Sequence, residues 1–383
     1  MKLIVDENIP LADEFFADFG ELIKKPGRLL TRDDVKDADV LLVRSVTQVN
    51  EALLRETSVK FVGSATIGVD HVDLEYLRAQ GIGFASAPGC NAVAVVEYVA
   101  AALLDLEARL GWSMTGKTLG IVGLGNVGSR LKPVFEDLGL TVLACDPLLT
   151  EQGRQGLVPL AEVLQADIVT LHTPLTRSGA WPTYHMLGAE ELQALPQGAI
   201  LINASRGPVI DNQALRAVLE DRVDLAVVLD VWEGEPLVDP ELAQRVEIAT
   251  PHIAGHSYDG KARGTAMIYA ALCAHLQVPI SKSLLDLIPA SAAFVIDLNE
   301  CDAINSCREL VRRVYRIEED DVNLRSALQH AREHRIAAFD QLRKHYRLRR
   351  EFGSVALRGV EAFRDRVDPA EMARIKALGF SLD

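Results

Sequence analysis

Short apolar runs alternate along most of the chain with longer stretches in which apolar residues recur every three or four positions. A short β-branched run is typical of a strand that is buried on both faces, whereas the longer spacing is typical of an amphipathic helix. This alternation predicts an α/β fold with parallel sheets. The predicted strands are residues 2–6, 40–43, 61–64, 81–84, 119–122, 140–145, 168–171, 199–203, 225–230 and 246–250.

The helical pattern is clearest at residues 92–110 and from Tyr258 to about Leu276. The second of these helices is expected to return the chain to the first domain, which would make that domain discontinuous. The pattern changes from about residue 286, where a strand at 294–298 and a helix at 303–315 precede an arginine-rich run at 332–350. We therefore expect domains at 1–95 plus 256–285, at 96–255 and at 286–383.

The composition is that of a compact globular protein, with 49% hydrophobic and 25% charged residues among 383. A formal net charge of −14 argues against nucleic acid or an anionic membrane as the main partner. No apolar segment reaches the length of a membrane span, and Asp6 and Glu7 interrupt any apolar signal-peptide core. The five cysteines show no metal-ligand spacing, so we predict a cytoplasmic protein with free thiols and no metal site.

A glycine motif follows the predicted strand 119–122 and precedes a predicted helix. Gly123, Gly125 and Gly128 form the Gly-x-Gly-x-x-Gly pattern that lets a backbone approach a pyrophosphate at a helix N-terminus. The next strand ends at Asp146, 18 residues after Gly128, where a carboxylate can accept from ribose hydroxyls and repels a 2′-phosphate. The pattern predicts a Rossmann-type doubly wound domain that binds NAD rather than NADP.

Polar residues follow three of the predicted strands in the first domain. Arg44, Ser45 and Thr47 follow the second strand, Thr66 the third, and small residues the fourth. Ligands of open α/β sheets gather at the carboxyl ends of strands, so these residues are substrate-site candidates. The alternative for Ser45 and Thr47 is that they cap the helix that runs through Leu53.

Three ionisable residues follow successive strands in the second half of the chain: Arg206, Glu235 and His252. In a parallel sheet they would converge on the edge where the nicotinamide lies. His252 can exchange a proton near neutral pH, and a neighbouring Glu235 would raise its pKa and fix the ring. Arg206 can bind an α-carboxylate through two guanidinium nitrogens at once. The alternatives are a surface ion-pair arginine, a loop carboxylate and a strand-end histidine without catalytic roles.

With these residues the chain resembles the D-isomer-specific 2-hydroxyacid dehydrogenases over about residues 1–285. The resemblance rests on the glycine motif, on residues 203–207, on residues 230–236 and on residues 250–255. It implies that Arg206 binds carboxylate and carbonyl and that Glu235 with His252 forms the acid/base pair. It also implies NAD contacts from residues of the strand ends: Gly123, Gly125, Asn126, Val127, Gly128, Asp146, Thr173, Ala204, Ser205, Arg206, Asp230 and Gly255.

The opening residues 2–10, the segments 44–47, 65–71 and 89–92, and the tail at 339–344 and 349–352 resemble one branch of this family. That resemblance implies a flavodoxin-like substrate-binding lid domain, a small α+β C-terminal domain that forms a homodimer, and a small phosphorylated hydroxy acid as substrate. It implies substrate contacts from Ser45 and Thr66. A tyrosine is expected where His256 stands, and Tyr258 lies two residues on, so both remain candidates.

The substrate's phosphate must be bound by local basic groups, since the net charge is negative. The candidates are Arg44 and, across a dimer, the run from Arg343 to Arg350; a solvated basic helix face is the alternative. Two other functions remain open. The chain could be another D-2-hydroxyacid dehydrogenase, active on phosphoglycerate or on hydroxypyruvate and glyoxylate, or it could be an NAD(H)-sensing scaffold without catalysis.

Overall fold

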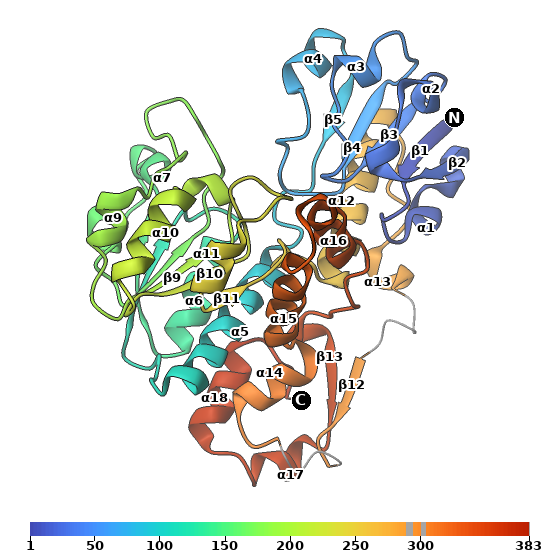
Figure 1. Cartoon of the computed structure of the whole chain (residues 1–383). Helices are drawn as coiled ribbons and strands as arrows, with labels where there is room; N and C mark the ends of the chain where they lie inside the picture. The colour runs from blue at the N-terminus through green and yellow to red at the C-terminus, as the bar shows by residue number, and fades with distance from the viewer. Residues whose placement is uncertain (289–293, 300–303, 383) are drawn as a thin grey trace. The chain divides into compact units, whose positions relative to one another are not determined.

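The computed structural model describes residues 1–288, 294–299 and 304–382 (Figure 1). The chain forms two compact units, which we describe separately. The first comprises residues 1–91 and 256–293, and the second comprises residues 92–255 and 294–383. Cys301 and the predicted helix start at Ala303 lie outside the described residues.

The first unit contains a five-stranded parallel sheet in the order β2-β1-β3-β4-β5. This is a flavodoxin-like strand order. The strands β3 and β4 are buried along their whole length, as their apolar sequences predict. The bounds are β1 Lys2–Asp6, β2 Glu21–Lys25, β3 Val40–Val43, β4 Phe61–Ser64 and β5 Gly83–Ala85.

A long helix from the later part of the chain, α12 (Tyr258–Leu276), packs on β4, β5 and α1 of this sheet. Its Ile268, Tyr269 and Leu272 join the apolar core formed by the N-terminal residues. The discontinuous arrangement expected for this part of the chain is therefore present. The other helices are α1 Ala12–Phe16, η1 Ala17–Phe19, η2 Gly27–Leu29, α2 Arg32–Val35, α3 Glu51–Leu54, α4 Leu74–Ala79 and α13 Leu284–Leu287.

The second unit contains a six-stranded parallel sheet in the order β11-β10-β9-β8-β6-β7. The order reverses between β6 and β8, which is the switch point where a Rossmann fold binds its dinucleotide. The fold class is therefore the predicted doubly wound one. The strands are β6 Thr118–Val122, β7 Thr141–Cys145, β8 Ile168–Leu171, β9 Ile200–Asn203, β10 Ala226–Leu229 and β11 Ile248–Ala249.

Helix α5 (Ala92–Leu110) lies in the core of the second unit. It is apolar on almost every face, with 14 buried residues among 19, which is the pattern of a helix enclosed on several sides. None of the helices in the described part of the chain is long and apolar enough to cross a membrane. The other helices between the strands are α6 Gly128–Asp137, α7 Pro147–Glu151, α8 Leu160–Val163, α9 Ala189–Gln193, η3 Gly207–Val209, α10 Asn212–Asp221 and α11 Pro240–Arg245.

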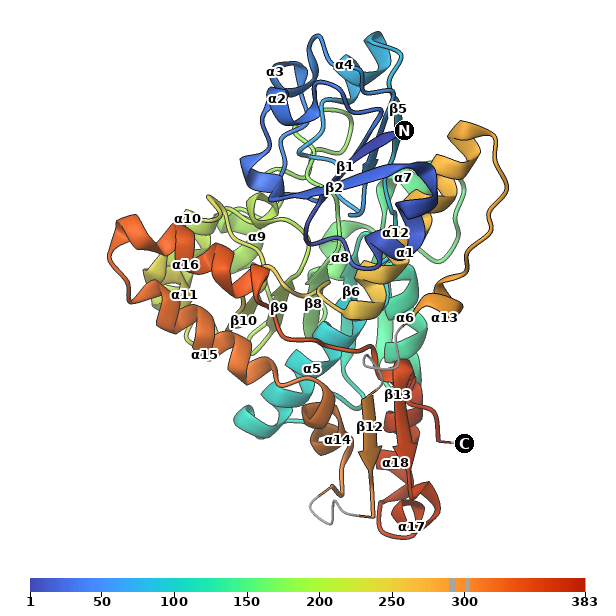
Figure 2. The same cartoon turned by 90° about the vertical axis from the view of Figure 1, so that its right-hand side faces the viewer.

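The C-terminal segment packs on this same unit: α14 and α15 lie beside α5 in both views (Figures 1 and 2). A two-stranded parallel sheet pairs β12 with β13. The three-way division of the chain remains a proposal, with residues 294–382 as a part that packs on the dinucleotide unit. The elements are β12 Phe294–Asp297, α14 Cys307–Val314, α15 Ile317–Leu328, α16 Arg332–Lys344, η5 Phe352–Ser354, β13 Val355–Arg358, α17 Val360–Arg364 and α18 Pro369–Ala377.

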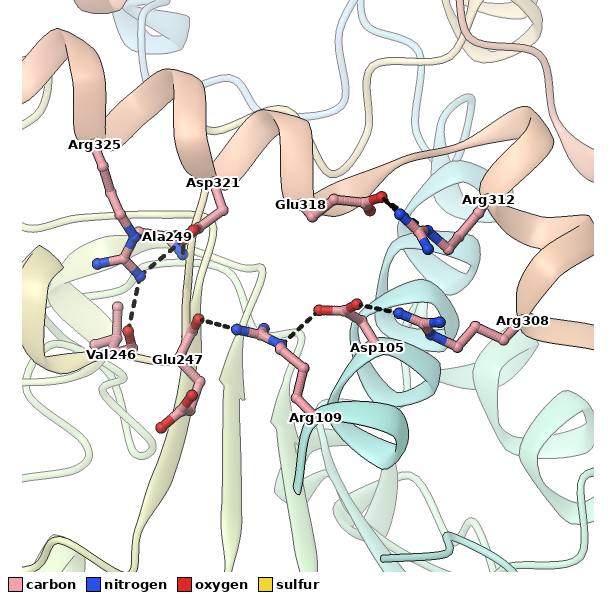
Figure 3. Close-up of polar contacts among 10 residues, drawn as sticks. All are labelled: Asp105, Arg109, Val246, Glu247, Ala249, Arg308, Arg312, Glu318, Asp321 and Arg325. Atoms are coloured by element: carbon pink, nitrogen blue, oxygen red, sulfur yellow. Dashed lines mark hydrogen bonds and ion pairs between the residues drawn. The ribbon is translucent and has the colours of Figure 1, made fainter. Parts of the chain in front are cut away.

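Helix α15 covers the edge strand β11, as the close-up in Figure 3 shows. The carboxylate of Asp321 accepts the backbone N–H of Ala249 at 2.7 Å, and Arg325 donates to the carbonyl of Val246 at 2.9 Å. Exposed edge groups invite pairing with another chain, so these contacts protect the edge. Two ion pairs fix the neighbouring helices, Arg308 to Asp105 at 3.2 Å and Arg312 to Glu318 (Figure 3).

Two local predictions for the first unit differ from the structure. The edge strand β2 was not predicted, because it is partly exposed and its sequence lacks a long apolar run. The cap of α3 is Asn50, whose side chain accepts the N–H of Leu53 at 3.2 Å. The capping alternative for Ser45 and Thr47 was therefore wrong: Thr47 is buried and donates to the carbonyl of Gly27 at 2.9 Å.

Candidate active site

The three motif glycines lie between β6 and α6, and each meets a different steric demand. Gly123 has φ +93°, a conformation that favours glycine. A Cβ on Gly128 would lie 2.1 Å from the carbonyl oxygen of Gly123, so the helix can approach the turn only without a side chain. A Cβ on Gly125 would meet nothing within 4 Å, which leaves that backbone open to a ligand. The loop therefore has the shape that a pyrophosphate requires.

Asp146 ends β7 and is the N-cap of α7. One of its carboxylate oxygens accepts the N–H of Leu149 at 3.1 Å, and the other accepts the N–H of Leu124 at 2.9 Å. The carboxylate thus ties the glycine loop to the next strand end. Each carboxylate oxygen can accept more than one hydrogen bond, so both remain able to accept from a ribose hydroxyl.

Thr173 follows β8, the strand next to the glycine loop. Its hydroxyl oxygen is buried and has no hydrogen-bond partner among the described residues. A buried polar atom without a partner costs free energy, which a ligand group can recover. Together with the open backbone at Gly125, this hydroxyl shows that the strand ends fit a bound dinucleotide. The neighbouring His172 is not a candidate base, because burial lowers its pKa to about 3.

The turn that carries Arg206 follows β9. The side chain of buried Asn203 accepts the N–H of Ser205 at 3.1 Å and donates to the carbonyl of Arg206 at 3.0 Å. At Gly207 a Cβ would lie 2.0 Å from the backbone carbon of Trp232, so this turn packs directly on the loop after β10. The local sequence therefore brings the Arg206 turn against the loop that carries Glu235.

His252 follows β11 in a left-handed conformation with φ +56°. Such a conformation is strained for a residue with a side chain. The buried carboxylate of Asp230 holds the loop by accepting the N–H of Ile253 at 2.8 Å and that of Ala254 at 2.9 Å. It also accepts the hydroxyl of Thr250 at 2.7 Å. Asp230 was predicted to contact NAD, and in this structure its carboxylate supports the His252 loop.

Glu235 and His252 form a pair. A carboxylate oxygen of Glu235 lies 2.7 Å from Nδ1 of His252, and its other oxygen accepts the N–H of Trp232 at 2.7 Å. Burial by itself would raise the pKa of Glu235, but the charge and hydrogen bond of His252, the Trp232 N–H and the charge of Arg343 lower it below its usual value. Glu235 therefore stays ionised and fixes the imidazole ring, leaving Nε2 for a reacting group.

The strands that precede Arg206, Asp230 and His252 are β9, β10 and β11, which are neighbours in the sheet. Glu235 lies five residues beyond Asp230 on the loop after β10. The sheet thus gathers a guanidinium, a carboxylate and an imidazole at its carboxyl edge, beside the strand ends that fit a dinucleotide. Such a set can anchor a carboxylate and move a proton.

The predicted substrate residues of the first unit follow its strands. Arg44 and Ser45 follow β3, and Ser45 is exposed. The hydroxyl of Thr66, after β4, lies 2.8 Å from that of Ser64. His256 and Tyr258 flank Ser257, which caps α12 by accepting the N–H of Gly260 at 2.9 Å. Their contacts with substrate stay predictions.

Sequence reasoning missed two groups near this edge. Nε2 of His185 lies 2.8 Å from a carboxylate oxygen of Glu233. One ring nitrogen of His185 and one carboxylate oxygen each of Asp211 and Glu233 all lie within 4.8 Å of one another. The contacts among these three residues hold the loop that leads to Glu235. Because the residues are far apart in the chain, their spacing in the sequence does not indicate that they meet. The second group is Arg343 and Arg349 of the C-terminal segment, which were candidates only as part of the basic run 343–350. No local motif shows their role beside the catalytic loop.

The comparisons with known proteins agree with this geometry. Residues 97–254 match the D-isomer specific 2-hydroxyacid dehydrogenase, NAD binding domain, and residues 287–379 match a domain of unknown function, DUF3410. The chain is similar to erythronate-4-phosphate dehydrogenases from Marinobacter nauticus, with 49% identity over 93% of this chain and 94% of the relative. The protein of that name from Pseudomonas entomophila is 50% identical over 93% and 94%.

Among solved structures, the NAD⁺-bound 3-phosphoglycerate dehydrogenase of Entamoeba histolytica matches with a TM-score of 0.62 and 26% identity. The match covers 72% of this chain and 95% of that structure. The two chains therefore share the dehydrogenase architecture, while this chain is longer by an additional C-terminal part.

Proposed function

The chain belongs to the erythronate-4-phosphate dehydrogenases of the NAD-dependent D-isomer-specific 2-hydroxyacid dehydrogenase family, and from that premise we propose that it oxidises 4-phospho-D-erythronate at its 2-hydroxyl. The product is (R)-3-hydroxy-2-oxo-4-phosphooxybutanoate. We place this step in the biosynthesis of pyridoxal 5′-phosphate (vitamin B6). The single observation that carries the assignment of chemistry is the His252–Glu235 pair, 2.7 Å apart at the carboxyl edge of the dinucleotide sheet.

The proposed mechanism assigns one task to each residue at this edge. Arg206 binds the α-carboxylate and polarises the oxygen at C2. Nε2 of His252 takes the hydroxyl proton as the carbonyl forms, and the ionised Glu235 stabilises the resulting imidazolium. Bound NAD would supply the acceptor for the hydride that leaves C2. In the reverse direction the protonated His252 returns its proton to the oxygen.

Residues of the glycine loop and the strand ends would hold the cofactor. The open backbone at Gly125 and the N–H groups opening α6 are suited to the diphosphate. Asp146 is suited to the ribose hydroxyls, and the buried hydroxyl of Thr173 supplies a further polar contact. Asn126, Val127, Ala204, Ser205 and Gly255 lie on the same loops and complete the proposed cofactor contacts.

The proposed substrate contacts outside the catalytic set are Ser45, Thr66, His256 and Tyr258, with Arg44 as a phosphate candidate. We also propose a homodimer formed through the C-terminal segment. Large apolar side chains stay exposed on or beside its helices, including Val322 at 63%, Ile336 at 45% and Leu348 at 56%. Exposed apolar groups of this kind mark surfaces that another chain can cover. Light scattering of the purified protein tests this assembly.

The function is tested by adding 4-phospho-D-erythronate with NAD, alone and with a second 2-oxo acid as hydride acceptor, and trapping the 2-oxo acid product. We expect turnover that 3-phosphoglycerate, glycerate and lactate do not match. Turnover of 3-phosphoglycerate without turnover of phosphoerythronate would replace the substrate assignment. NAD binding without turnover of any of these acids would favour the scaffold instead.

A further inference from the structure

The arginine-rich run of the C-terminal segment is largely committed to contacts within the chain. Arg347 donates to Glu319 and Asp320, at 3.1 Å each. Arg349 is buried and donates to backbone carbonyls. Arg335 donates to the carbonyl of His330 at 3.0 Å. Arg347 and Arg349 are therefore poorly placed to bind a substrate phosphate, either in their own subunit or across a dimer.

Arg343 differs from these three residues because none of the hydrogen bonds found among the described residues involves its guanidinium. Its Nε is buried and has no hydrogen-bond partner among the described residues, and its guanidinium carbon lies 5.9 Å from the centre of the Phe339 ring. A weak contact with an aromatic face does not satisfy the five N–H donors of a guanidinium. Arg343 is thus a partly buried cation whose hydrogen-bonding capacity is largely unused within the chain.

The position of Arg343 is set by helix α16. Phe339, one turn earlier, is 1% exposed and belongs to the same apolar cluster as Trp232 and Val238. Leu342 packs against that cluster as well. Trp232 and Val238 bracket the loop that carries Glu235. The apolar face of α16 is therefore buried, within one chain, in the same core as the residues that flank the catalytic loop.

The charge of Arg343 acts on Glu235 in this structure, where it helps to keep the carboxyl ionised. The oxygens of Glu235 bond to His252 and to the Trp232 N–H, and no hydrogen bond between Glu235 and Arg343 is found among the described residues. The guanidinium of Arg343 can therefore donate hydrogen bonds to another anion near Glu235. The net charge of −14 makes such a local cation necessary for an anionic substrate.

We propose that Arg343 binds the phosphate monoester of the substrate in the same subunit as the Glu235–His252 pair. This inference rests on the proposed function and makes Arg343 a determinant of specificity for phosphorylated over unphosphorylated 2-hydroxy acids. A planar guanidinium suits this task because it donates two parallel hydrogen bonds to phosphate oxygens. The proposal also gives helix α16 a role in substrate binding within its own subunit. Dehydrogenases that lack the C-terminal part have no such helix.

The first test compares Arg343→Ala with Arg335→Ala, a substitution on the same helix. Wild-type turnover of 4-phospho-D-erythronate is established beforehand, so failure of the proposed function is recognised separately. We expect Arg343→Ala to lower kcat/KM for phosphoerythronate by about 10- to 100-fold, mainly through KM, as for loss of charge-assisted hydrogen bonds. Arg335→Ala should match the wild type.

The unphosphorylated substrate shows which anion Arg343 binds. D-Erythronate lacks the phosphate but keeps the α-carboxylate, so Arg343→Ala should leave its kcat/KM within about twofold, and inorganic phosphate should lose its competition with substrate. NAD affinity of the variant should be unchanged, which shows that the dinucleotide unit is intact. An equal loss for both acids would contradict phosphate binding, and an unchanged KM for phosphoerythronate would overturn the proposal.

The second test decides between one subunit and two. Arg343→Ala and His252→Gln chains carrying different tags are co-expressed, and the hybrid is isolated. If Arg343 serves its own subunit, no site in the hybrid has both residues, and activity at low substrate is about half that of the Arg343→Ala protein. Recovery of about half the wild-type activity would show that the partner supplies Arg343 and would overturn the proposal. If light scattering shows that the protein is a monomer, the first test by itself reports a role within one chain.

Discussion

Nη2 of Arg349 donates to the carbonyl oxygen of Ala254 at 2.9 Å and also to that of Ala94 at 2.7 Å. Ala254 lies two residues beyond His252, and Ala94 lies in the first turn of α5. Arg349 is 1% exposed, and its guanidinium lies 4.2 Å from the centre of the Tyr315 ring. The C-terminal segment therefore holds the catalytic loop by a buried cation.

Replacing Arg349 with Met should lower the free energy of unfolding by about 2 to 4 kcal/mol, because two buried carbonyls lose charge-assisted hydrogen bonds. Urea denaturation measures the loss, with Arg335→Met, at a partly exposed position, as the control. Turnover measured at urea concentrations well below the unfolding transition should also fall, because the carbonyl of Ala254 loses its hydrogen bond from Arg349. A variant as stable and active as the control would show that the buried contact does not support the loop.

Replacing Asp230 should also disturb the loop that carries His252. Replacing it with Ala removes the acceptor for the N–H groups of Ile253 and Ala254, so the strained conformation of His252 loses its support. We expect kcat to fall by about 10- to 100-fold, the range for a misplaced catalytic group. Steady-state kinetics with saturating NAD separates this effect from any loss of cofactor binding. A change in the KM for NAD alone would assign Asp230 to the cofactor, as the family resemblance implied.

Glu235 and His252 should behave as one unit. Glu235→Gln should lower kcat by about 10²-fold, because the imidazolium loses its charged partner, and His252→Gln should lower it by at least as much. The double variant should be no slower than His252→Gln alone. Losses that multiply in the double variant would show that the two residues act independently.

Asp146 predicts the choice of cofactor. Asp146→Ser removes the carboxylate that would repel a 2′-phosphate, so the ratio of kcat/KM for NAD over NADP should fall by about 10-fold or more. Part of the change comes from weaker NAD binding, since Asp146 also accepts the N–H of Leu124. Kinetics with both cofactors measures the ratio. A ratio equal to that of the wild type would remove Asp146 from ribose recognition.

Titration of the Asp320 carboxyl should make the stability of the fold depend on pH. Burial raises the pKa of Asp320 from 3.8 to about 6, although Arg347 and Tyr346 act in the opposite direction. Between these two values the folded chain binds the extra proton, so this carboxyl makes stability fall as pH rises, by about 3 kcal/mol across the window. Urea midpoints at several pH values should show a slope that Asp320→Asn removes. Equal slopes in both proteins would contradict the raised pKa.

Much of the sheet architecture could be predicted from sequence, because apolar runs such as residues 40–43 and 168–171 must be buried on both faces. The edge strand β2 could not, because its side chains are partly exposed and its pairing with β1 depends on the completed sheet. Helices α15 and α16 were not delimited in advance, because their charged residues mask an apolar face that is used only against the dinucleotide unit. Local pattern thus predicts elements that bury themselves and misses those whose burial depends on a distant partner.

The candidate site follows the same division. Arg206, Glu235 and His252 could be proposed because each follows an apolar run in a predicted parallel sheet. The support for the His252 loop by Asp230 and Arg349 could not, because it joins residues 22 or more positions apart through backbone groups that carry no sequence signal. Arg343 was a candidate only as part of a basic run. Its place in the fold depends on the burial of Phe339 in the core that also contains Trp232.

In the proposed mechanism, His252 exchanges the proton when a 2-hydroxy acid is oxidised at this edge. The most direct measurement is single-turnover NADH formation from 4-phospho-D-erythronate by wild type and His252→Gln, with NAD affinity measured for both. We expect unchanged NAD affinity and a rate lower by about two or more orders of magnitude in the variant. An unchanged rate of NADH formation with intact NAD binding would contradict it.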